Sequence, residues 1–370
     1  MLRAVIENQD TEHPVFALKE NIEPIPLRML ERKTDEDWLA VSREQWTHLF
    51  DDPKKPLAQL LWVKGQSESE IIWVMPHCIC DGVTCVTLMG ELFSLLDDPS
   101  VNLQPYPMFR SVDEFLPTGF DNKRSKRKSK LYLFLARLYF FMQRKSKKRN
   151  LGENYVFHWK LDSLVTTNII QWCKSQQISV HALLCGVFMQ AFRQVQGTAS
   201  KGKVICHVDI RHFIPEIKQD HLFAFAPTVE LSLKKGKGSL IGSARQIKDE
   251  LRGKIQKLNA RELLWMGERM HPVLGKMISL LKSARGGHDI TLSNMGKIDI
   301  PDTYKNFKVE TVYSPTVAFP WLNSNTLVVS TFGGQMDFTF MSNEHFLSQE
   351  EAIKIKNCAT DLLASSIQNS

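Results

Sequence analysis

The sequence of 370 residues has none of the long hydrophobic runs found in exported or membrane-spanning proteins. Its N-terminus lacks a basic segment followed by an apolar stretch, and no run of about eighteen apolar residues occurs anywhere. The seven cysteines are an odd number, and most lie in apolar runs, where a thiol behaves as a small hydrophobic group. We therefore predict a protein of a reducing compartment, the cytoplasm, with no transmembrane segment.

Several catalytic signatures are also missing. The sequence contains no Gly-x-Ser-x-Gly elbow, no Walker phosphate loop and no His-Glu-x-x-His helix, which excludes the common hydrolase, nucleotide-binding and zinc-protease classes. His77, Cys78 and Cys80 lie close together, but neighbours on a strand face opposite sides, and no second Cys or His pair follows at zinc spacing. We predict neither a metal site nor a bound cofactor.

One segment has no acidic residues. Residues 123–149 contain twelve Lys or Arg and no Asp or Glu, and because the whole chain carries +7, the remainder carries −5. The basicity is therefore a local feature and not a general attraction to anionic partners. Two basic clusters, 123–130 and 144–149, enclose the apolar and aromatic segment 131–142.

A helix of this composition is suited to lie in the interface of an anionic membrane. Its apolar residues cover most of the circumference, and the flanking cations add attraction to the surface. The alternative is a solvated linker helix docked on the protein. Nucleic-acid binding is disfavoured, because the aromatic residues cluster between the cations and do not interleave with them. We predict peripheral association with the inner face of the membrane through residues 123–149.

A chain of this length with 43% hydrophobic residues is long enough for two lobes, each with its own core. We place an N-terminal lobe at 1–122, a linker helix at 123–150 and a C-terminal lobe at 151–370. Helical and strand periodicities alternate, so the predicted class is α/β or α+β, with mixed sheets, flanking helices and a cleft between the lobes. For the C-terminal lobe we predict strands at 155–161, 203–209, 228–234, 308–314, 325–332 and 335–341, and helices at 163–173, 181–195, 240–257 and 348–367.

A short segment of the N-terminal lobe is suited to proton transfer. The apolar strand 70–75 runs into Pro76 and His77, and a helix follows Asp81 and Gly82. This order places His77 at a sheet edge, and histidine is the residue type best suited to acid–base work near neutral pH. Gly82 leaves room for the close approach of a ligand or a neighbouring backbone. On spacing alone, a hydrogen-bonded histidine at a strand end beside a loop carboxylate fits equally well.

The turn resembles the His-x-x-x-Asp-Gly active-site motif of the chloramphenicol acetyltransferase-like superfamily. That superfamily includes peptide-synthetase condensation domains, alcohol acyltransferases and polyketide-lipid acyltransferases. Further stretches agree with it in order along nearly the whole chain: Leu2–Ile6, Val180–Leu184, Val208–Arg211, Leu292–Ile298 and Phe332–Asp337. The resemblance also implies that the first strand and helix of the family are missing here.

The resemblance assigns roles to individual residues. His77 is implied as the general base that deprotonates an acceptor, and Asp81 as a structural partner that pairs with an arginine, here Arg3. Arg3 also fits an ordinary surface cation. Ser293 and Asn294 are candidates for holding substrate or an oxyanion, and they equally fit a turn at the lobe interface.

The implied function is an O-acyltransferase. It would move an acyl group from acyl-CoA or an acyl-carrier protein, as cosubstrate, to a hydroxyl of a hydrophobic alcohol or glycolipid. Condensation domains carry two adjacent histidines, and Pro76 stands at the first position here, so amide formation is the less favoured alternative. A catalytically silent domain that binds a lipid or a carrier protein is the other alternative. We expect a monomer.

Overall fold

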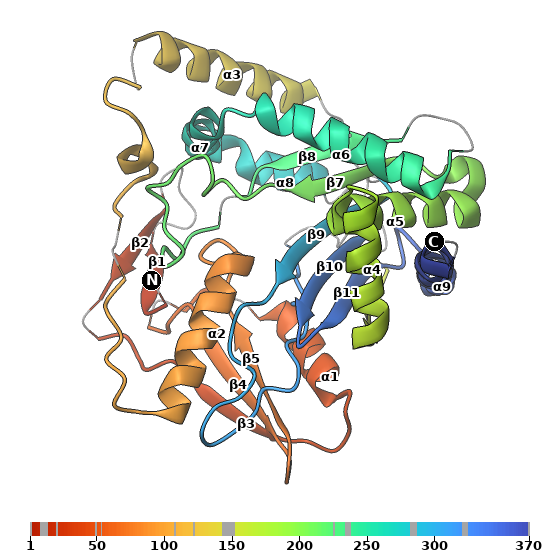
Figure 1. Ribbon diagram of the computed structural model, residues 1–370. Coiled ribbons are helices and arrows are strands. Elements are labelled where there is room, and N and C mark those ends of the chain that lie inside the picture. Colours follow the sequence, from red (N-terminus) through yellow and green to blue (C-terminus); the bar gives the residue numbers. More distant parts are fainter. Residues whose placement is uncertain are drawn as a thin grey trace.

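Three sheets and their flanking helices make up the chain, as the computed structural model in Figure 1 shows. The structure describes all residues except 1, 8–13, 20, 49, 53, 107–108, 121–122, 143–151, 225, 234–237, 282–286, 320–324 and 369–370. Helices and strands alternate along the sequence, so the predicted mixed α/β class with flanking helices is confirmed.

The N-terminal part of the chain forms two small sheets. Strand β1 (Ala4–Glu7) pairs antiparallel with β2 (Val15–Leu18). In the second sheet, β4 (Gln59–Lys64) lies between β3 (Leu27–Glu31), which is parallel to it, and β5 (Ser69–Val74), which is antiparallel. Because β5 runs directly into residues 77–82, which we call the histidine turn, this sheet fixes where the turn lies.

The C-terminal part forms a six-stranded mixed sheet in the order β6-β11-β10-β9-β7-β8. Strand β9 is parallel to both of its neighbours, and the remaining pairs are antiparallel. The strands are β6 (Asn154–Leu161), β7 (Lys203–His207), β8 (Thr228–Ser232), β9 (Ile290–Lys297), β10 (Thr326–Phe332) and β11 (Gln335–Asn343).

Four helices contribute to the core on one face of this sheet: α4 (Ser163–Ser175), α5 (Val180–Gln196), α6 (Leu240–Gln256) and α9 (Gln349–Gln368). The central helix is α5, with α6 and α9 alongside it. Every residue of α5 from Ala182 to Met189 is buried, because neighbours surround the helix beyond the single apolar face that its sequence predicts. The predicted cap of α4 is also present, since the Val165 backbone N–H donates to Asp162 Oδ1 at 2.8 Å.

The N-terminal part of the chain covers the opposite face of the six-stranded sheet. Helix α1 (Asp37–Glu44) places Trp38 in a stacked contact with Tyr313, 3.9 Å between ring centroids, and Trp38 also meets the ring of His158 on β6 edge-on. His158 Nε2 lies 2.7 Å from the buried Asp337 on β11. These contacts join the N-terminal helix to the C-terminal sheet.

Helix α2 (Gly82–Asp97) packs against a segment from much later in the sequence. After β9 the chain runs alongside α2 and turns back toward β10 (Figure 1). Ile298, Val309 and Val312 of this segment form an apolar cluster with Val86 and Met89 of α2. The histidine turn is therefore held beside β9, more than two hundred residues away in the sequence.

Helix α3 (Lys123–Met142) lies at the outer edge of the structure, next to α7 (Ala260–Arg269) and α8 (Leu274–Leu281) (Figure 1). Residues 143–150 of the predicted linker helix lie outside the described residues. Within the described part of the chain, no single helix is long and apolar enough to cross a membrane. Together α4 and α5 pass by length and composition, but they are bent by 104° and belong to the core.

The prediction of a strand at 308–314 is wrong. This segment forms only one isolated bridge, between Thr303 and Lys308. Its backbone finds other partners, because Val309 N–H donates to Asp302 O and Ser314 N–H donates to the side chain of Asp337. Alternating buried residues gave it the pattern of a strand, although no neighbouring strand pairs with it.

Candidate active site

His77 lies in the turn between β5 and α2, and its ring is held by the backbone. Its Nδ1 is 2.8 Å from the carbonyl oxygen of Cys80. A carbonyl oxygen can only accept a hydrogen bond, so Nδ1 carries the proton. In the neutral ring this leaves the lone pair on Nε2, and the side chain of His77 is exposed. The turn therefore presents one defined basic nitrogen.

Asp81 closes the turn as the N-cap of α2. Its Oδ1 accepts from the Thr84 backbone N–H at 3.0 Å, and the Thr84 hydroxyl accepts from the Asp81 backbone N–H at 2.8 Å. This reciprocal capping box satisfies the backbone at the start of the helix. A capping residue is fixed in position, so the carbonyl of the preceding Cys80 is also well placed to orient His77.

The second carboxylate oxygen of Asp81 pairs with an arginine from the C-terminal part of the chain. Arg211 Nη1 lies 2.6 Å from Asp81 Oδ2, and both side chains are largely buried. Arg211 follows β7 by four residues and also contacts Asp209 Oδ1. The pair therefore links the helix N-terminus of one part of the chain to the sheet of the other.

The predicted pairing of Asp81 with Arg3 is wrong. Arg3 directs its guanidinium to the carbonyl oxygen of Ile22, at 2.8 Å. It lies beside β1, where that carbonyl offers a nearby acceptor, whereas Arg211 follows the strand end that reaches the turn. The Val208–Arg211 stretch was recognised in the sequence, but the spacing of residues does not say which arginine meets a carboxylate across a lobe interface.

Gly82 allows β9 to approach the first turn of α2. A Cβ atom at this position would lie 3.1 Å from Met295 Cε, closer than most real Cβ contacts. Met295 is pushed out by an irregularity in β9, opposite Val329 and Ser330, next to Gly296 with φ of +71°. Of the two predicted substrate-binding residues, Asn294 shapes this feature, because its Oδ1 accepts from the Gly296 N–H at 2.9 Å.

Ser293 lies one residue before Asn294 on β9 and is half-buried. The turn-shaping alternative for Asn294 agrees with the geometry, and a role of either residue in substrate binding stays a prediction. The structure thus brings β9 and the histidine turn together through Gly82 and Met295.

Two residues near His77 were not predicted. The ring of Phe319 lies 6.2 Å from that of His77 at an interplanar angle of 25°. His207, at the end of β7, has an exposed side chain, but desolvation by the surrounding protein, followed by the nearby His77, lowers its pKa, which favours the neutral form. Neither residue belongs to a recognisable motif. The sequence indicates only that His207 lies near the end of the predicted strand 203–209.

The cysteines of the turn are in surroundings that disfavour the thiolate. A hydrogen bond with Cys85, followed by burial, raises the pKa of the Cys80 thiol well above its usual range. Cys78 is exposed, but desolvation by the surrounding turn raises its pKa as well. Thiols are nucleophiles and metal ligands as thiolates, so this environment favours His77 as the reactive group of the turn.

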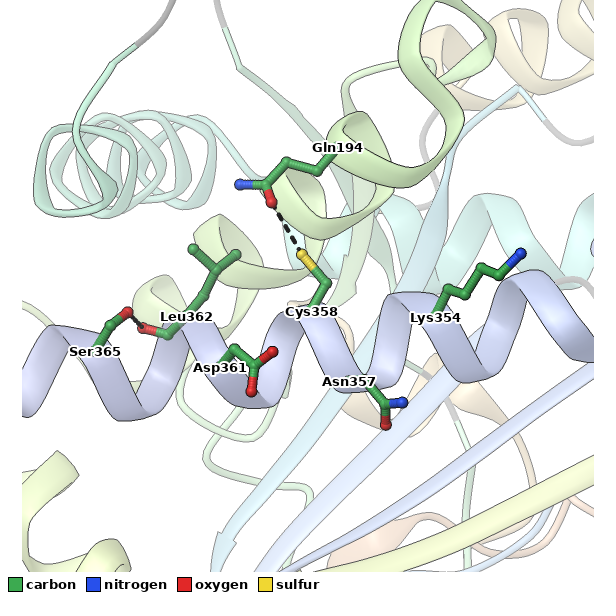
Figure 2. A pocket seen from close by; sticks show the side chains of 7 residues that line it. All are labelled: Gln194, Lys354, Asn357, Cys358, Asp361, Leu362 and Ser365. Carbon is green, nitrogen blue, oxygen red and sulfur yellow. Dashed lines mark hydrogen bonds between the residues drawn. The ribbon is translucent and has the colours of Figure 1, made fainter.

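A pocket elsewhere on the surface contains none of the predicted site residues. It is lined by Gln194 of α5 and by residues of α9, among them Lys354, Cys358 and Asp361 (Figure 2). Cys358 Sγ lies 3.1 Å from Gln194 Oε1 there. This open pocket belongs to the outer side of the helical layer and not to the histidine turn.

Comparison with known proteins supports the resemblance. The family model for the phthiocerol/phthiodiolone dimycocerosyl transferase C-terminus matches residues 155–341. No curated protein matches the sequence significantly. Among solved structures, a trichothecene 15-O-acetyltransferase from Fusarium sporotrichioides has a TM-score of 0.71 at 14% identity, covering 99% of this chain and 83% of its own.

Two further structures are similar over the whole chain. Polyketide synthase associated protein 5 from Mycobacterium tuberculosis has a TM-score of 0.61 at 13% identity, with 100% of this chain and 88% of its own covered. The epimerization domain of tyrocidine synthetase B has a TM-score of 0.60 at 13% identity, with 100% and 85% covered. At such identities these likenesses show the fold alone, while the family match spans half of the chain. The chain therefore belongs to the phthiocerol/phthiodiolone dimycocerosyl transferase C-terminal family of acyltransferases, with the chloramphenicol acetyltransferase-like fold.

Proposed function

We propose that this chain transfers an acyl group from a CoA or carrier-protein thioester to the hydroxyl of a hydrophobic acceptor, with His77 as the general base. The observation that carries the proposal is the orientation of the imidazole. Its Nδ1–H donates to the Cys80 carbonyl oxygen, and Nε2 is left to accept a proton. The capping box and the Asp81–Arg211 pair hold the backbone that sets this orientation.

The chemical step needs only this nitrogen and the two substrates. Nε2 takes the proton of the acceptor hydroxyl while the oxygen attacks the thioester carbonyl and forms a tetrahedral intermediate. When the intermediate collapses, the C–S bond breaks, and the leaving sulfur takes the proton from the imidazolium. The products are an ester and a free thiol, and His77 returns to its starting state. The chain needs no bound cofactor for this step.

The neutral side chain of His207 suits this chemistry. A second positive charge near His77 would oppose the imidazolium that forms during transfer, and desolvation together with His77 itself lowers the pKa of His207. Phe319 supplies an apolar surface roughly parallel to the His77 ring. Both features favour proton transfer at a single site.

The experiment that tests this proposal measures thiol release from a panel of acyl-CoAs, with and without a lipid-alcohol extract. Wild type should show acceptor-dependent release, and His77→Ala should lose roughly 10²- to 10⁴-fold in rate, the usual contribution of a positioned base. His48→Ala removes an exposed imidazole of the same lobe and is the matched control. If folded wild type releases no thiol, the same panel on acyl-carrier protein follows, and failure there favours a silent binding domain.

A second proposal concerns α3, which we infer lies on an anionic membrane surface. Ser125, Ser129, Leu133, Ala136 and Phe140 form the less exposed stripe of the helix, at helical spacing. Apart from Arg137, the rest of its second half carries large apolar side chains that are exposed, with Phe134 at 62% and Phe141 at 84%. The exposed apolar residues are Leu131, Tyr132, Phe134, Leu135, Leu138, Tyr139, Phe141 and Met142.

An isolated exposed apolar side chain needs no explanation, but a continuous apolar surface on one helix indicates a partner. The first two turns of α3 carry Lys123, Arg124, Lys126, Arg127 and Lys130, all exposed. Cations near an anionic surface each contribute about 1 kcal/mol to binding. Apolar side chains that enter the headgroup region add the hydrophobic term. The free thiols of the chain support a cytoplasmic location, so the inner leaflet is the surface that we propose.

Sedimentation with liposomes tests the membrane proposal. Wild type should sediment with vesicles that contain phosphatidylserine and not with vesicles of phosphatidylcholine alone, and rising salt should weaken binding. The triple variant Phe134→Gln, Leu138→Gln, Phe141→Gln should lose binding. Leu164→Gln, which removes a side chain of α4 with 72% exposure, is the control. Equal binding of all three proteins would contradict the proposal.

A further inference from the structure

Three soft donor atoms meet between α5 and β7, on the face of the sheet away from His207. His181 and Cys185 lie four residues apart on α5, and therefore on the same side of the helix. Cys206 lies on β7 and points into the same core, because Val204 and Cys206 alternate with the residues of the other face. Both cysteines are fully buried, and His181 is half-buried.

The distances within this cluster match those of a metal site. Cys185 Sγ lies 3.6 Å from His181 Nε2 and 3.6 Å from Cys206 Sγ, and all three atoms lie within 4.8 Å of one another. With Zn–S bonds of about 2.3 Å and a Zn–N bond of about 2.0 Å, tetrahedral angles place two sulfurs about 3.8 Å apart and a sulfur and a nitrogen about 3.5 Å apart. Two of the three donor pairs are therefore already spaced as ligands, and the third lies within 4.8 Å, a separation that a change of side-chain rotamer can close.

The charge balance also fits the interior. Two thiolates neutralise a divalent cation, and a neutral imidazole adds a third ligand, so the complex carries no net charge into an apolar core. Thiolate and imidazole donors select zinc or other soft cations and not calcium or magnesium. An ion would enter past His181, the one ligand with solvent access.

We propose that His181, Cys185 and Cys206 form a zinc site that joins α5 to β7. His181 Nε2 and the two Sγ atoms supply three ligands, and the fourth position is open to water. On binding, the two thiols lose their protons to solvent and become thiolates. The ion would connect the helix to the strand and take no part in acyl transfer, because the cluster lies in the core behind the sheet, away from the histidine turn.

The site would brace the strand that leads to the Asp81–Arg211 pair. Cys206 lies five residues before Arg211, and His207 is the next residue along β7. A metal that fixes the end of β7 against α5 would thus steady both residues on the opposite face. The proposal does not depend on acyl transfer and is tested without measuring it.

The test is zinc retention by the purified full chain. Wild type is incubated with zinc, freed of excess by gel filtration and assayed for metal by mass spectrometry. We expect about one zinc ion for each chain, the number that a single site holds. Cys206→Ser and His181→Gln should retain at least tenfold less. Cys173→Ser removes a buried thiol of α4 outside the cluster and should retain as much as wild type.

A second readout separates binding from folding. Cobalt in place of zinc should give wild type and Cys173→Ser a thiolate-to-cobalt charge-transfer band, and zinc should raise their melting temperature. His181→Gln changes only a half-buried side chain, so the test stands even if Cys206→Ser does not fold. Equal zinc retention by all four proteins, no retention by wild type, or a Cys185–Cys206 disulfide in protein purified with reductant would overturn the proposal.

Discussion

The histidine turn and helix α3 are held by the rest of the molecule in opposite ways. The turn is fixed by a capping box within it, by Arg211 from the C-terminal part of the chain and by Met295 of β9 against Gly82. Helix α3 packs at its edge against α7, α8 and the short helix between them, the Lys128–Glu262 ion pair ties it there, and most of its large apolar side chains are exposed.

The difference teaches where fixed geometry is needed. A general base works only if its nitrogen stays aligned with the reacting proton, and this requires supporting contacts around it. A surface helix that meets a fluid membrane needs no such alignment, and its apolar side chains stay exposed until a partner covers them. The comparison predicts that changes in the turn affect catalysis or stability, while changes on the outer face of α3 leave stability unchanged and affect the rate only when the acceptor lies in a membrane.

The largest effect is expected from His77→Ala. The rate of acceptor-dependent thiol release should fall roughly 10²- to 10⁴-fold, because a positioned base is lost. The free energy of unfolding in urea should stay within about 0.5 kcal/mol of wild type, since the exposed side chain leaves no cavity. If His77→Ala instead lost both several kcal/mol of stability and its substrate binding, the role of His77 would be structural.

The next effect concerns the two arginines. Arg211→Met should lower the free energy of unfolding by roughly 3–5 kcal/mol, because Asp81 is left largely buried without its partner. Arg3→Met should cost less than about 1 kcal/mol, since Arg3 is exposed and donates to one carbonyl. Urea denaturation measures both variants, and equal losses would remove the distinction between the two arginines.

A smaller effect is expected from pH, through the buried His221 beside the Arg211 loop. Burial lowers its pKa, which Asp220 partly opposes, and its Nδ1 accepts from the Lys218 N–H at 2.9 Å. The unfolded chain therefore binds the proton more readily, and this contribution is present above about pH 6.5 and lost as the pH falls below it. The slope for one group is at most about 1.4 kcal/mol per pH unit.

His221→Gln should flatten the stability profile between about pH 5 and 6.5, the range below the ordinary histidine pKa. Exposed His48→Ala should leave the profile unchanged. If the profile of the His221 variant keeps its full slope, other histidines with lowered pKa, such as His288, carry the acid sensitivity.

The smallest effect is expected from the triple glutamine variant of α3 at Phe134, Leu138 and Phe141. Its free energy of unfolding should stay within about 0.5 kcal/mol of wild type, because exposed positions away from special features tolerate substitution. A loss of several kcal/mol would mean that this face packs against the protein, and the contrast with the turn would fail.

Much of this fold follows from local patterns in the sequence. Apolar periodicity predicts the strand into Pro76, helix α2 and the strands β6, β10 and β11, and capping chemistry predicts the role of Asp162. His77, Asp81 and Gly82 follow from the motif. Segment 308–314 also has the pattern of a strand, but no neighbouring strand pairs with it. Strand pairing is a tertiary property, and the local sequence pattern does not predict it.

The rest of the site depends on contacts between distant segments. Asp81 and Arg211 are 130 residues apart, and the resemblance points to Arg3 instead, because spacing does not show which arginine meets the turn across the two parts of the chain. Helix α7 and strand β9 are not among the predicted elements either. In β9, Asn294 and Gly296 form the irregularity and interrupt the apolar pattern of a strand. Of the cluster His181, Cys185 and Cys206, only the helical spacing of the first two is visible in the sequence.

One measurement tests the central claim most directly: acceptor-dependent thiol release, with the acceptor presented either in anionic liposomes or in detergent micelles. We predict that His77→Ala loses roughly 10²- to 10⁴-fold in rate in both, while the triple α3 variant loses rate on liposomes and regains the wild-type rate in micelles. If His77→Ala keeps the wild-type rate in micelles, His77 is not the catalytic base and the account is wrong.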